Sequence, residues 1–278
     1  MGYDGYTCLN VTVDRGVGFV TLDHGPINLF DSTLIGDLAK VGWQLENDPA
    51  VKVVVLQSVN PDFFIAHADI NLIEKLPPVP PPRKEKLGLF QATVDRFRTM
   101  PKATIAKIEG RCRGGGSELA LSCDMRFAAR GKAILGQPEV GIGIIPGGSG
   151  SVRLPRLLGR GRALEIILGC GDFSADEAER YGYVNRALPP EEIGDFVNRL
   201  AYRIASFPLE TVALAKQAVA LAERGIEDDL VREEELFLQS VHLDSTRRRM
   251  ATALAIGMQT ADIERGNFDT LWPMLADE

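Results

Sequence analysis

The sequence predicts an α/β fold followed by a helical C-terminal region, and two observations support this. Up to about residue 188, short β-branched runs alternate with segments of helical periodicity, whereas nearly all of the later chain has helical periodicity. A strand-like run also leads twice into a turn and the start of a helix, at 51–69 and at 104–120. We therefore expect an α/β core over 1–188 and a helical oligomerisation region over 189–278.

Each expected element follows from a local pattern. Two strand-like runs, 8–13 and 17–22, are joined by the turn-forming sequence DRG and predict a β-hairpin. Apolar residues at helical spacing predict a helix that is capped by Ser32 and ends near Asn47. A buried strand is expected over 51–56, followed by an irregular loop and a helix from near Asp69. An exposed proline linker over 77–82 leads to a helix over 84–99. A strand over 103–108, a helix that ends near Cys123 and a strand over 125–129 come next.

The later elements are mostly helical. Gly147, Gly148 and Ser149 open a helix that runs toward Leu158. A short strand-like piece over 183–187 interrupts the helical pattern that follows. The helical ranges are 161–168, 174–180, 190–206, 208–224 and 228–262.

Composition and charge narrow the class of protein. Hydrophobic residues make up 45% of the 278 residues, and the net charge of −7 argues against a general nucleic-acid or anionic-membrane surface. No apolar stretch approaches the roughly 20 residues that span a bilayer, and the first residues lack a secretory pattern. The four cysteines are scattered without a CxxC pair, which is typical of reduced thiols. We expect a soluble cytoplasmic protein that binds neither nucleic acid nor membrane.

The central stretch, 104–125, combines a strand, three consecutive glycines and a helix that carries Glu118 in its first turn. Glycines let the backbone come close to a ligand, and the free N–H groups of a helix start favour negative charge. The turn could therefore hold an oxyanion, with Glu118 beside it for proton transfer. The alternative is ordinary punctuation before a helix, with a glutamate that complements the helix dipole.

Other common motifs are missing from the sequence. The runs GIGIIP and GGGSEL fail the GxGxxG pattern, no GK[ST] follows a glycine run, and there is no GxSxG. The three histidines lack zinc-ligand spacing, so no metal site is expected.

A second glutamate, Glu139, follows Pro138 in another glycine-rich segment. Paired carboxyl groups in an apolar pocket can act as general base and general acid if burial raises at least one pKa. The alternative is that Glu139 is a surface loop residue.

Several runs of this chain occur in one known pattern, in the same order, over about residues 8–220. They are DPAVKVVVL, FFIAHADI, MPKATIAKIEG, GGGSELALSCDMRFAA, LGQPEVGIGIIPGGSGSVRLPRLLG and ILGCGDFSADEAERYGYVNRALP. In these runs the chain resembles the crotonase superfamily, the enoyl-CoA hydratase/isomerase family. The resemblance implies a spiral of repeated ββα units, a helical tail that builds a homotrimer or a dimer of trimers, and a coenzyme A thioester as substrate.

The resemblance also implies roles for individual residues. The two oxyanion-hole amides match Ala68 and Gly115, and the two catalytic glutamates match Glu118 and Glu139. We expect further residues to line the substrate path: Ala66, His67, Asp69, Ile70, Gly114, Pro138 and Gly147. The presence of both glutamates points to hydration of a 2-enoyl-CoA, with Glu118 mainly as base and Glu139 as proton donor. The coenzyme belongs to the substrate, so no separate cofactor is expected.

Three features depart from the family. His67 stands where the family usually has glycine, one extra residue lies between the two glutamates in the turn 129–132, and the C-terminal tail lacks the usual FxxKR ending. We expect an ordinary backbone at His67, with an imidazole that projects into or beside the pocket and narrows the acyl site or hydrogen-bonds near the thioester. Two alternatives remain open: an enoyl-CoA isomerase or other acyl-CoA lyase with a single base, and a non-catalytic acyl-CoA-binding protein.

Overall fold

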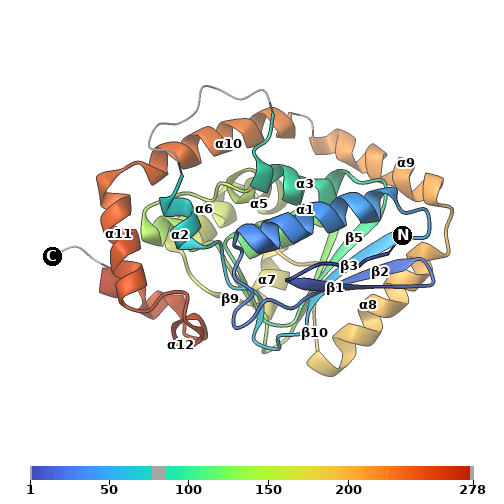
Figure 1. Ribbon diagram of the computed structural model, residues 1–278, viewed down its shortest axis with the longest axis horizontal. Helices are drawn as coiled ribbons and strands as arrows, with labels where there is room; N and C mark the ends of the chain where they lie inside the picture. The colour runs from blue at the N-terminus through green and yellow to red at the C-terminus, as the bar shows by residue number, and fades with distance from the viewer. Residues whose placement is uncertain (1, 77–85, 224, 276–278) are drawn as a thin grey trace.

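The computed structural model describes residues 2–76, 86–223 and 225–275, and its strands form two sheets (Figure 1). The larger sheet has the order β1-β2-β3-β5-β7-β10, and the smaller has the order β4-β6-β8-β9. The strands are β1 Leu9–Asp14, β2 Val17–Leu22, β3 Val53–Ser58, β4 Phe63–Ile65, β5 Ala103–Ile108, β6 Arg111–Arg113, β7 Met125–Ala129, β8 Ile134–Gly136, β9 Phe173–Ser174 and β10 Arg186–Leu188.

Helices cover both sheets and make up most of the chain after β10. The α-helices are α1 Ser32–Asn47, α2 Ile70–Glu74, α3 Leu89–Thr99, α4 Gly115–Ser122, α5 Gly150–Leu158, α6 Arg160–Gly169, α7 Ala175–Tyr181, α8 Pro190–Ala205, α9 Leu209–Ala220, α10 Ile226–Val241, α11 Asp244–Ala255 and α12 Ala261–Glu264. The 3₁₀ turns are η1 Glu139–Ile142, η2 Leu221–Glu223, η3 Phe268–Thr270 and η4 Trp272–Leu275. The predicted α/β fold class is confirmed.

The larger sheet starts with the predicted hairpin. Strands β1 and β2 pair antiparallel across a turn in which Arg15 and Gly16 have φ values of 47° and 82°. The remaining neighbours, from β2 through β3, β5 and β7 to β10, pair in parallel. The parallel strands of a sheet covered on both faces are buried on both faces, which explains the uninterrupted β-branched run in β3.

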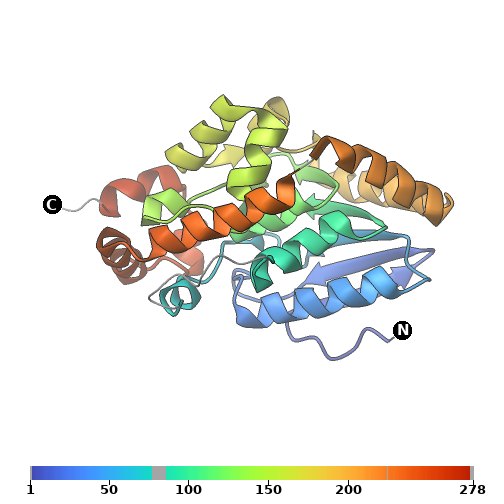
Figure 2. The ribbon, with the colours of Figure 1, turned by 90° about the horizontal axis from the view of Figure 1, so that it is seen from above.

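Each face of the larger sheet packs against helices. Helices α1 and α3 lie side by side on one face, where Leu34, Leu38 and Val94 join the main core (Figure 2). On the other face, α8 packs a stripe of side chains at every fourth position against β3, β5 and β7. That stripe consists of Ile193, Val197, Ala201 and Ala205. The first helix after residue 188 therefore adds to the core of the sheet, and the division of the chain at residue 188 remains a prediction.

The later helices reach opposite ends of the molecule. Figures 1 and 2 both place α8 and α9 at one end and α11 and α12 at the other, with α10 between them. None of the described helices is by itself long and apolar enough to cross a membrane. The bent pair Pro190–Ala205 and Leu209–Glu223 together has the length and the apolar composition of a membrane span, by these two criteria only.

Several element boundaries differ from the prediction. Asp31, not Ser32, caps α1, because its carboxylate accepts from the amides of Thr33 and Leu34. Helix α3 begins at Leu89 instead of residue 84, while the proline linker 77–82 lies outside the described residues. The expected strand over 183–187 lies at 186–188, after a buried turn.

Two larger features were predicted wrongly. The range 228–262 is not continuously helical: it breaks at His242–Leu243, between α10 and α11, and again before α12. The loop after β3 contains β4, which pairs with β6 in a second sheet. The strands of this sheet have only two or three residues each, too few for a period-2 pattern to be visible in the sequence.

Candidate active site

Two backbone amides meet at the edge of the smaller sheet. Strands β4 and β6 are parallel neighbours, so the turns at their carboxyl ends lie together. One is the Ala68 turn (residues 66–69) before α2, and the other is the start of α4 at Gly115. A Cβ built on Gly115 would lie 3.6 Å from the Ala68 Cβ. Within the described residues neither amide donates to a protein acceptor, as expected for the first residue of a helix.

Glycine is required just before α4. Gly114 has φ 50° and ψ −125°, a conformation that side chains other than hydrogen rarely tolerate. A Cβ there would also lie 2.9 Å from Glu139 Oε1 and 3.2 Å from the His67 Cβ. The structure thus brings Gly114, His67 and Glu139 together.

Glu118 lies in the first turn of α4 and is buried. Its Oε1 accepts from the amides of Gly148 and Gly150, at 2.8 Å each, where the chain enters α5. Burial raises the pKa of Glu118 to about 7, although the amide hydrogen bonds favour its charged form. One oxygen is therefore fixed, and the group can exchange a proton near neutral pH.

Glu139 opens the 3₁₀ turn η1 and is buried too, so the surface-loop alternative is excluded. With its amide oriented to satisfy both neighbours, Gln137 donates to Oε1 and Oε2 of Glu139 at 3.1 and 3.0 Å and accepts from the Ser117 hydroxyl at 3.1 Å. Burial raises the pKa of Glu139 well above its usual value, and the negative charge of Glu118 raises it further. The two carboxyl groups therefore share one site, in which burial favours the protonated form of each.

Phe90 of α3 is a site residue that the sequence reasoning missed. A Cβ on Gly115 would lie 3.2 Å from its ring, and a Cβ on Gly148 would overlap the ring and lie 2.5 Å from Glu118 Oε2. The ring thus borders both the amide pair and Glu118. It also packs edge-to-face on Phe30, with ring centroids 4.9 Å apart. No local pattern marks this residue, because an aromatic side chain on an amphipathic helix is ordinary core.

Glu233 of α10 is a third buried carboxyl group that the sequence did not reveal. It accepts from the amide of Val152, at 2.9 Å, in the first turn of α5. Burial raises the pKa of Glu233 well above its usual value, and the charge of Glu118 adds to the rise. Both Glu118 and Glu233 therefore hold the start of α5.

His67 keeps an ordinary backbone, since it is not among the described residues with positive φ, and this part of the prediction is confirmed. Its ring nitrogens both contact protein acceptors: Nδ1 lies 2.8 Å from the Ala68 carbonyl oxygen, and Nε2 lies 2.9 Å from Glu264 Oε1. The ring is buried against α12 instead of being free to narrow the acyl site. Glu264 lies 197 residues away in the sequence, so no local signal could have found it.

The other predicted lining residues surround the same turns. Ala66 and Ile70 are buried, with side chains in apolar clusters, so only their backbone is available to a ligand. Asp69 caps α2 by accepting from the Asn71 amide at 2.9 Å. Pro138 directly precedes Glu139 and caps η1.

Gly147 lies in the loop that leads into α5. Its carbonyl oxygen accepts from Gln91 Nε2 at 3.0 Å. A Cβ on Gly147 would overlap the Phe237 ring of α10, so this loop requires glycine to pack.

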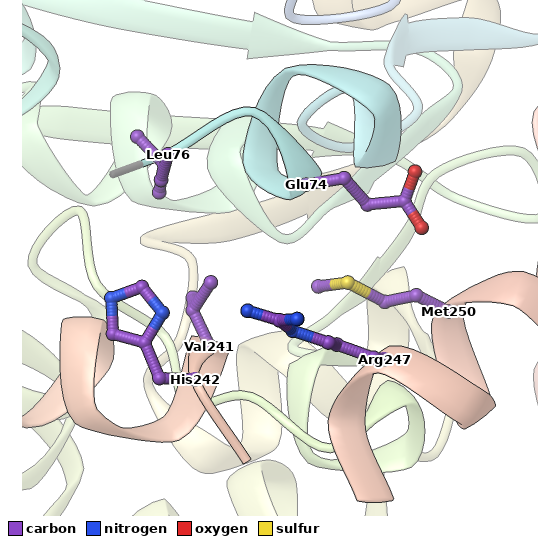
Figure 3. A pocket seen from close by; sticks show the side chains of 6 residues that line it. All are labelled: Glu74, Leu76, Val241, His242, Arg247 and Met250. Atoms are coloured by element: carbon purple, nitrogen blue, oxygen red, sulfur yellow. The ribbon is translucent and has the colours of Figure 1, made fainter. Parts of the chain in front are cut away.

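A cavity of about 340 Å³ opens between α2 and the junction of α10 with α11 (Figure 3). Its lining residues are Glu74, Leu76, Val241, His242, Arg247 and Met250. Val241 and Met250 belong to the apolar cluster that also contains Ile70 and packs against Ala68. Helix α11 also contacts both α2 and η1, the turn that carries Glu139.

One group of possible metal ligands lies elsewhere in the described chain: Cys8, His24 and Asp31. The His24 ring stands between the other two, with Nδ1 3.2 Å from Cys8 Sγ and Nε2 2.9 Å from Asp31 Oδ2. Burial raises the pKa of the Cys8 thiol to about 12. In this structure the three side chains form a hydrogen-bonded chain.

The chain is similar to known enoyl-CoA hydratases and isomerases over most of its length. The sequence profile described as enoyl-CoA hydratase/isomerase matches residues 12–255. A short-chain-enoyl-CoA hydratase of Clostridium acetobutylicum is 36% identical over 216 residues, covering 77% of this chain and 80% of that protein. A crotonyl-CoA hydratase of Syntrophomonas wolfei is 39% identical over 188 residues, covering 68% of this chain and 70% of that protein.

Solved structures agree with these relatives. The crystal structure of a candidate enoyl-CoA hydratase from Streptomyces avermitilis superimposes with a TM-score of 0.90 at 35% identity, covering 99% of this chain and 100% of that one. An enoyl-CoA hydratase/isomerase from Xanthobacter autotrophicus superimposes with a TM-score of 0.79 at 26% identity, covering 94% and 98%.

Proposed function

This chain belongs to the enoyl-CoA hydratase/isomerase family and is an enoyl-CoA hydratase, and we propose that Glu118, Glu139 and the amides of Ala68 and Gly115 carry out its reaction. The observation that carries this proposal is the juxtaposition of two unpartnered amides with two buried carboxyl groups of raised pKa. The enzyme is a hydro-lyase, which adds water reversibly to a 2-enoyl-CoA thioester.

The amides stabilise the thioester oxygen. Attack of water at Cβ of the enoyl group moves negative charge onto the carbonyl oxygen, which lies between the N–H groups of Ala68 and Gly115. Fixed donors in a site without bulk water gain strength as the charge develops, and one such donor is worth about 3–4 kcal/mol of barrier. Phe90 and Phe30 border this position and help to exclude water from it.

The two glutamates divide the proton transfers. Glu118, with a pKa of about 7, is substantially ionised at neutral pH and takes a proton from the attacking water. Glu139, whose pKa is raised by burial and by the charge of Glu118, delivers a proton to Cα. After hydration Glu118 is protonated and Glu139 is ionised, which is the arrangement that dehydration requires. The same pair of glutamates therefore serves hydration and dehydration, because each proton transfer of one direction is reversed in the other.

The substrate supplies its own coenzyme, so we propose no separate cofactor. The cavity between α2 and α11 is suited to the distal part of the acyl group, because its apolar wall continues to the Ala68 turn. The Arg247 guanidinium and the buried Nε2 of His242 make no hydrogen bond within the described residues, which leaves both available to a polar acyl end. A screen of enoyl-CoA esters with short, long and carboxylate-terminated acyl groups tests this assignment.

We also propose that the enzyme is a homotrimer or a dimer of trimers in the cytoplasm. The support is α9, which has no buried residue in the single chain and exposes Leu214 and Val219 at 64% and 74%. All four cysteines are free and buried, as suits a reducing compartment. Sedimentation at micromolar concentration should give the mass of three or six chains, and a monomer would contradict the assembly.

Crotonyl-CoA provides the test of the reaction. Incubation with the enzyme should remove the absorbance of the conjugated double bond and yield 3-hydroxybutyryl-CoA. A 3-enoyl-CoA should be converted much more slowly. Rapid conversion of the 3-enoyl ester without hydration would indicate an isomerase. Tight binding without turnover of either ester would indicate a non-catalytic binding protein.

A further inference from the structure

The protonation state of His67 follows from its two partners. A carbonyl oxygen only accepts hydrogen bonds, so Nδ1 donates to Ala68, and with Glu264 ionised Nε2 donates to its carboxylate. A histidine that donates from both ring nitrogens is an imidazolium. The Ala68 turn therefore contains a buried positive charge.

Glu264 is held in place for this pairing. Its Oε1 also accepts from the Gln259 amide at 2.8 Å, and its side chain is fully buried. Arg113 Nη1 donates to the Glu264 carbonyl oxygen at 2.9 Å, and the Arg113 guanidinium binds Asp172 with two hydrogen bonds of 2.7 and 2.6 Å. The positive charges of His67 and Arg113 thus alternate with the carboxylates of Glu264 and Asp172. This network attaches α12 to β6 and to the Ala68 turn.

The network fixes the peptide groups on both sides of the Ala68 amide. The preceding carbonyl, that of His67, accepts from the Phe30 amide at 2.9 Å. The following carbonyl, that of Ala68, accepts from the His67 ring. With both carbonyls held, the Ala68 N–H between them has little freedom to turn away from the Gly115 amide.

We propose that His67, as an imidazolium paired with Glu264, is a positioning residue that aims the Ala68 amide at the thioester oxygen. The proposal rests on the proposed function, because the amide matters only if a thioester binds there. A neutral ring can donate from one nitrogen only, so loss of its proton breaks the bond either to Ala68 or to Glu264. Turnover should therefore fall when His67 is deprotonated.

The charged groups around the ring decide when this happens. Those nearest to it are Glu264 from α12 and Arg113 from β6, with Asp172 behind Arg113 and Glu139 across Gly114, while Asp69 in the same turn accepts from Gln259. Burial lowers the pKa of His67, but the charge and hydrogen bond of Glu264 outweigh it, and the pKa is raised overall. Burial alone would raise the pKa of Glu264, but His67 lowers it. The pair therefore forms between the two pKa values and is lost above that of His67 and below that of Glu264.

Nuclear magnetic resonance of the ring nitrogens tests the charge without any assay of activity. In protein labelled with ¹⁵N-histidine, three histidines give ring signals, and the signal of His67 is identified as the one missing from the variant H67Q. His67 should show the imidazolium signature at pH 7, and E264Q should lower its pKa by about one unit or more, because an ionic partner is removed. A neutral His67 in the wild type at pH 7, or a pKa that E264Q leaves unchanged, would overturn the proposal.

Kinetics with crotonyl-CoA test the positioning role. E264Q and H67Q should each lower kcat at least about tenfold while KM changes less, because the amide acts mainly on the developing oxyanion. The matched control is D262N on the same helix, whose carboxylate is 99% exposed and should leave kcat unchanged. If E264Q and H67Q both retain wild-type kcat with crotonyl-CoA, His67 does not position the amide. If the wild type itself has no activity, the proposed function fails, and the resonance experiment still decides the charge of His67.

Discussion

Gly148 is the position at which one added methyl group should disturb catalysis most directly. An alanine Cβ there would overlap the Phe90 ring and lie 2.5 Å from Glu118 Oε2. Because heavy atoms pack at about 3.5 Å or more, the carboxyl group must move by roughly 1 Å. Gly148 does not have a positive φ, so the backbone itself tolerates alanine.

A displacement of this size in a catalytic group costs about 100-fold in rate. We expect G148A to lower kcat for crotonyl-CoA by about that factor, measured as loss of the conjugated absorbance, with a smaller change in KM. Adding F90A should restore only part of the activity, because the contact with Glu118 remains. The matched control is G194A in α8, where a Cβ meets nothing within 4 Å, and it should be fully active. Wild-type kcat in G148A would refute the geometry given for Glu118.

Three further results are expected. The profile of kcat/KM against pH should be bell-shaped. It should rise near pH 7 as Glu118 ionises and fall at alkaline pH as Glu139 loses its proton. A flat profile would contradict both roles. The pKa of Glu139 is raised in the folded state. Its contribution to folding stability is therefore fully present below the usual glutamate pKa and is lost as pH rises. E139Q should therefore raise Tm at pH 8 but not at pH 4, and an equal shift at both would exclude this cause. G110A should lower the free energy of unfolding in denaturant by roughly 2 kcal/mol or more, because the added Cβ would lie 2.5 Å from the Asp62 carbonyl oxygen. An unchanged unfolding midpoint would contradict that packing.

The half of the site that we propose to be catalytic could be inferred from the sequence because its signals are local. Three glycines followed by Glu118 define a turn and a helix start within a few residues, and Glu139 lies in a similar segment. The sequence resemblance supplied the match of Ala68 to the first amide, and parallel pairing of β4 with β6 explains why it meets Gly115.

The supporting half was not predictable, because its contacts join distant parts of the chain. Glu264 reaches His67 from α12, Glu233 reaches α5 from α10, and Phe90 borders the amides from α3. On its own element each of these residues looks like an ordinary polar or apolar position. The sequence left open whether the His67 ring would narrow the acyl site or hydrogen-bond near the thioester, because its partner Glu264 could not be seen from the turn. In the structure the ring contacts the Ala68 carbonyl oxygen and Glu264.

The most direct test of the two-carboxyl mechanism replaces each glutamate by its uncharged isostere. Crotonyl-CoA hydration is measured for E118Q and E139Q, together with binding of a saturated acyl-CoA by calorimetry. We predict that each variant loses at least about 100-fold in kcat, because each removes one proton transfer, while acyl-CoA binding is largely retained. Full hydratase activity in either single variant would contradict the mechanism.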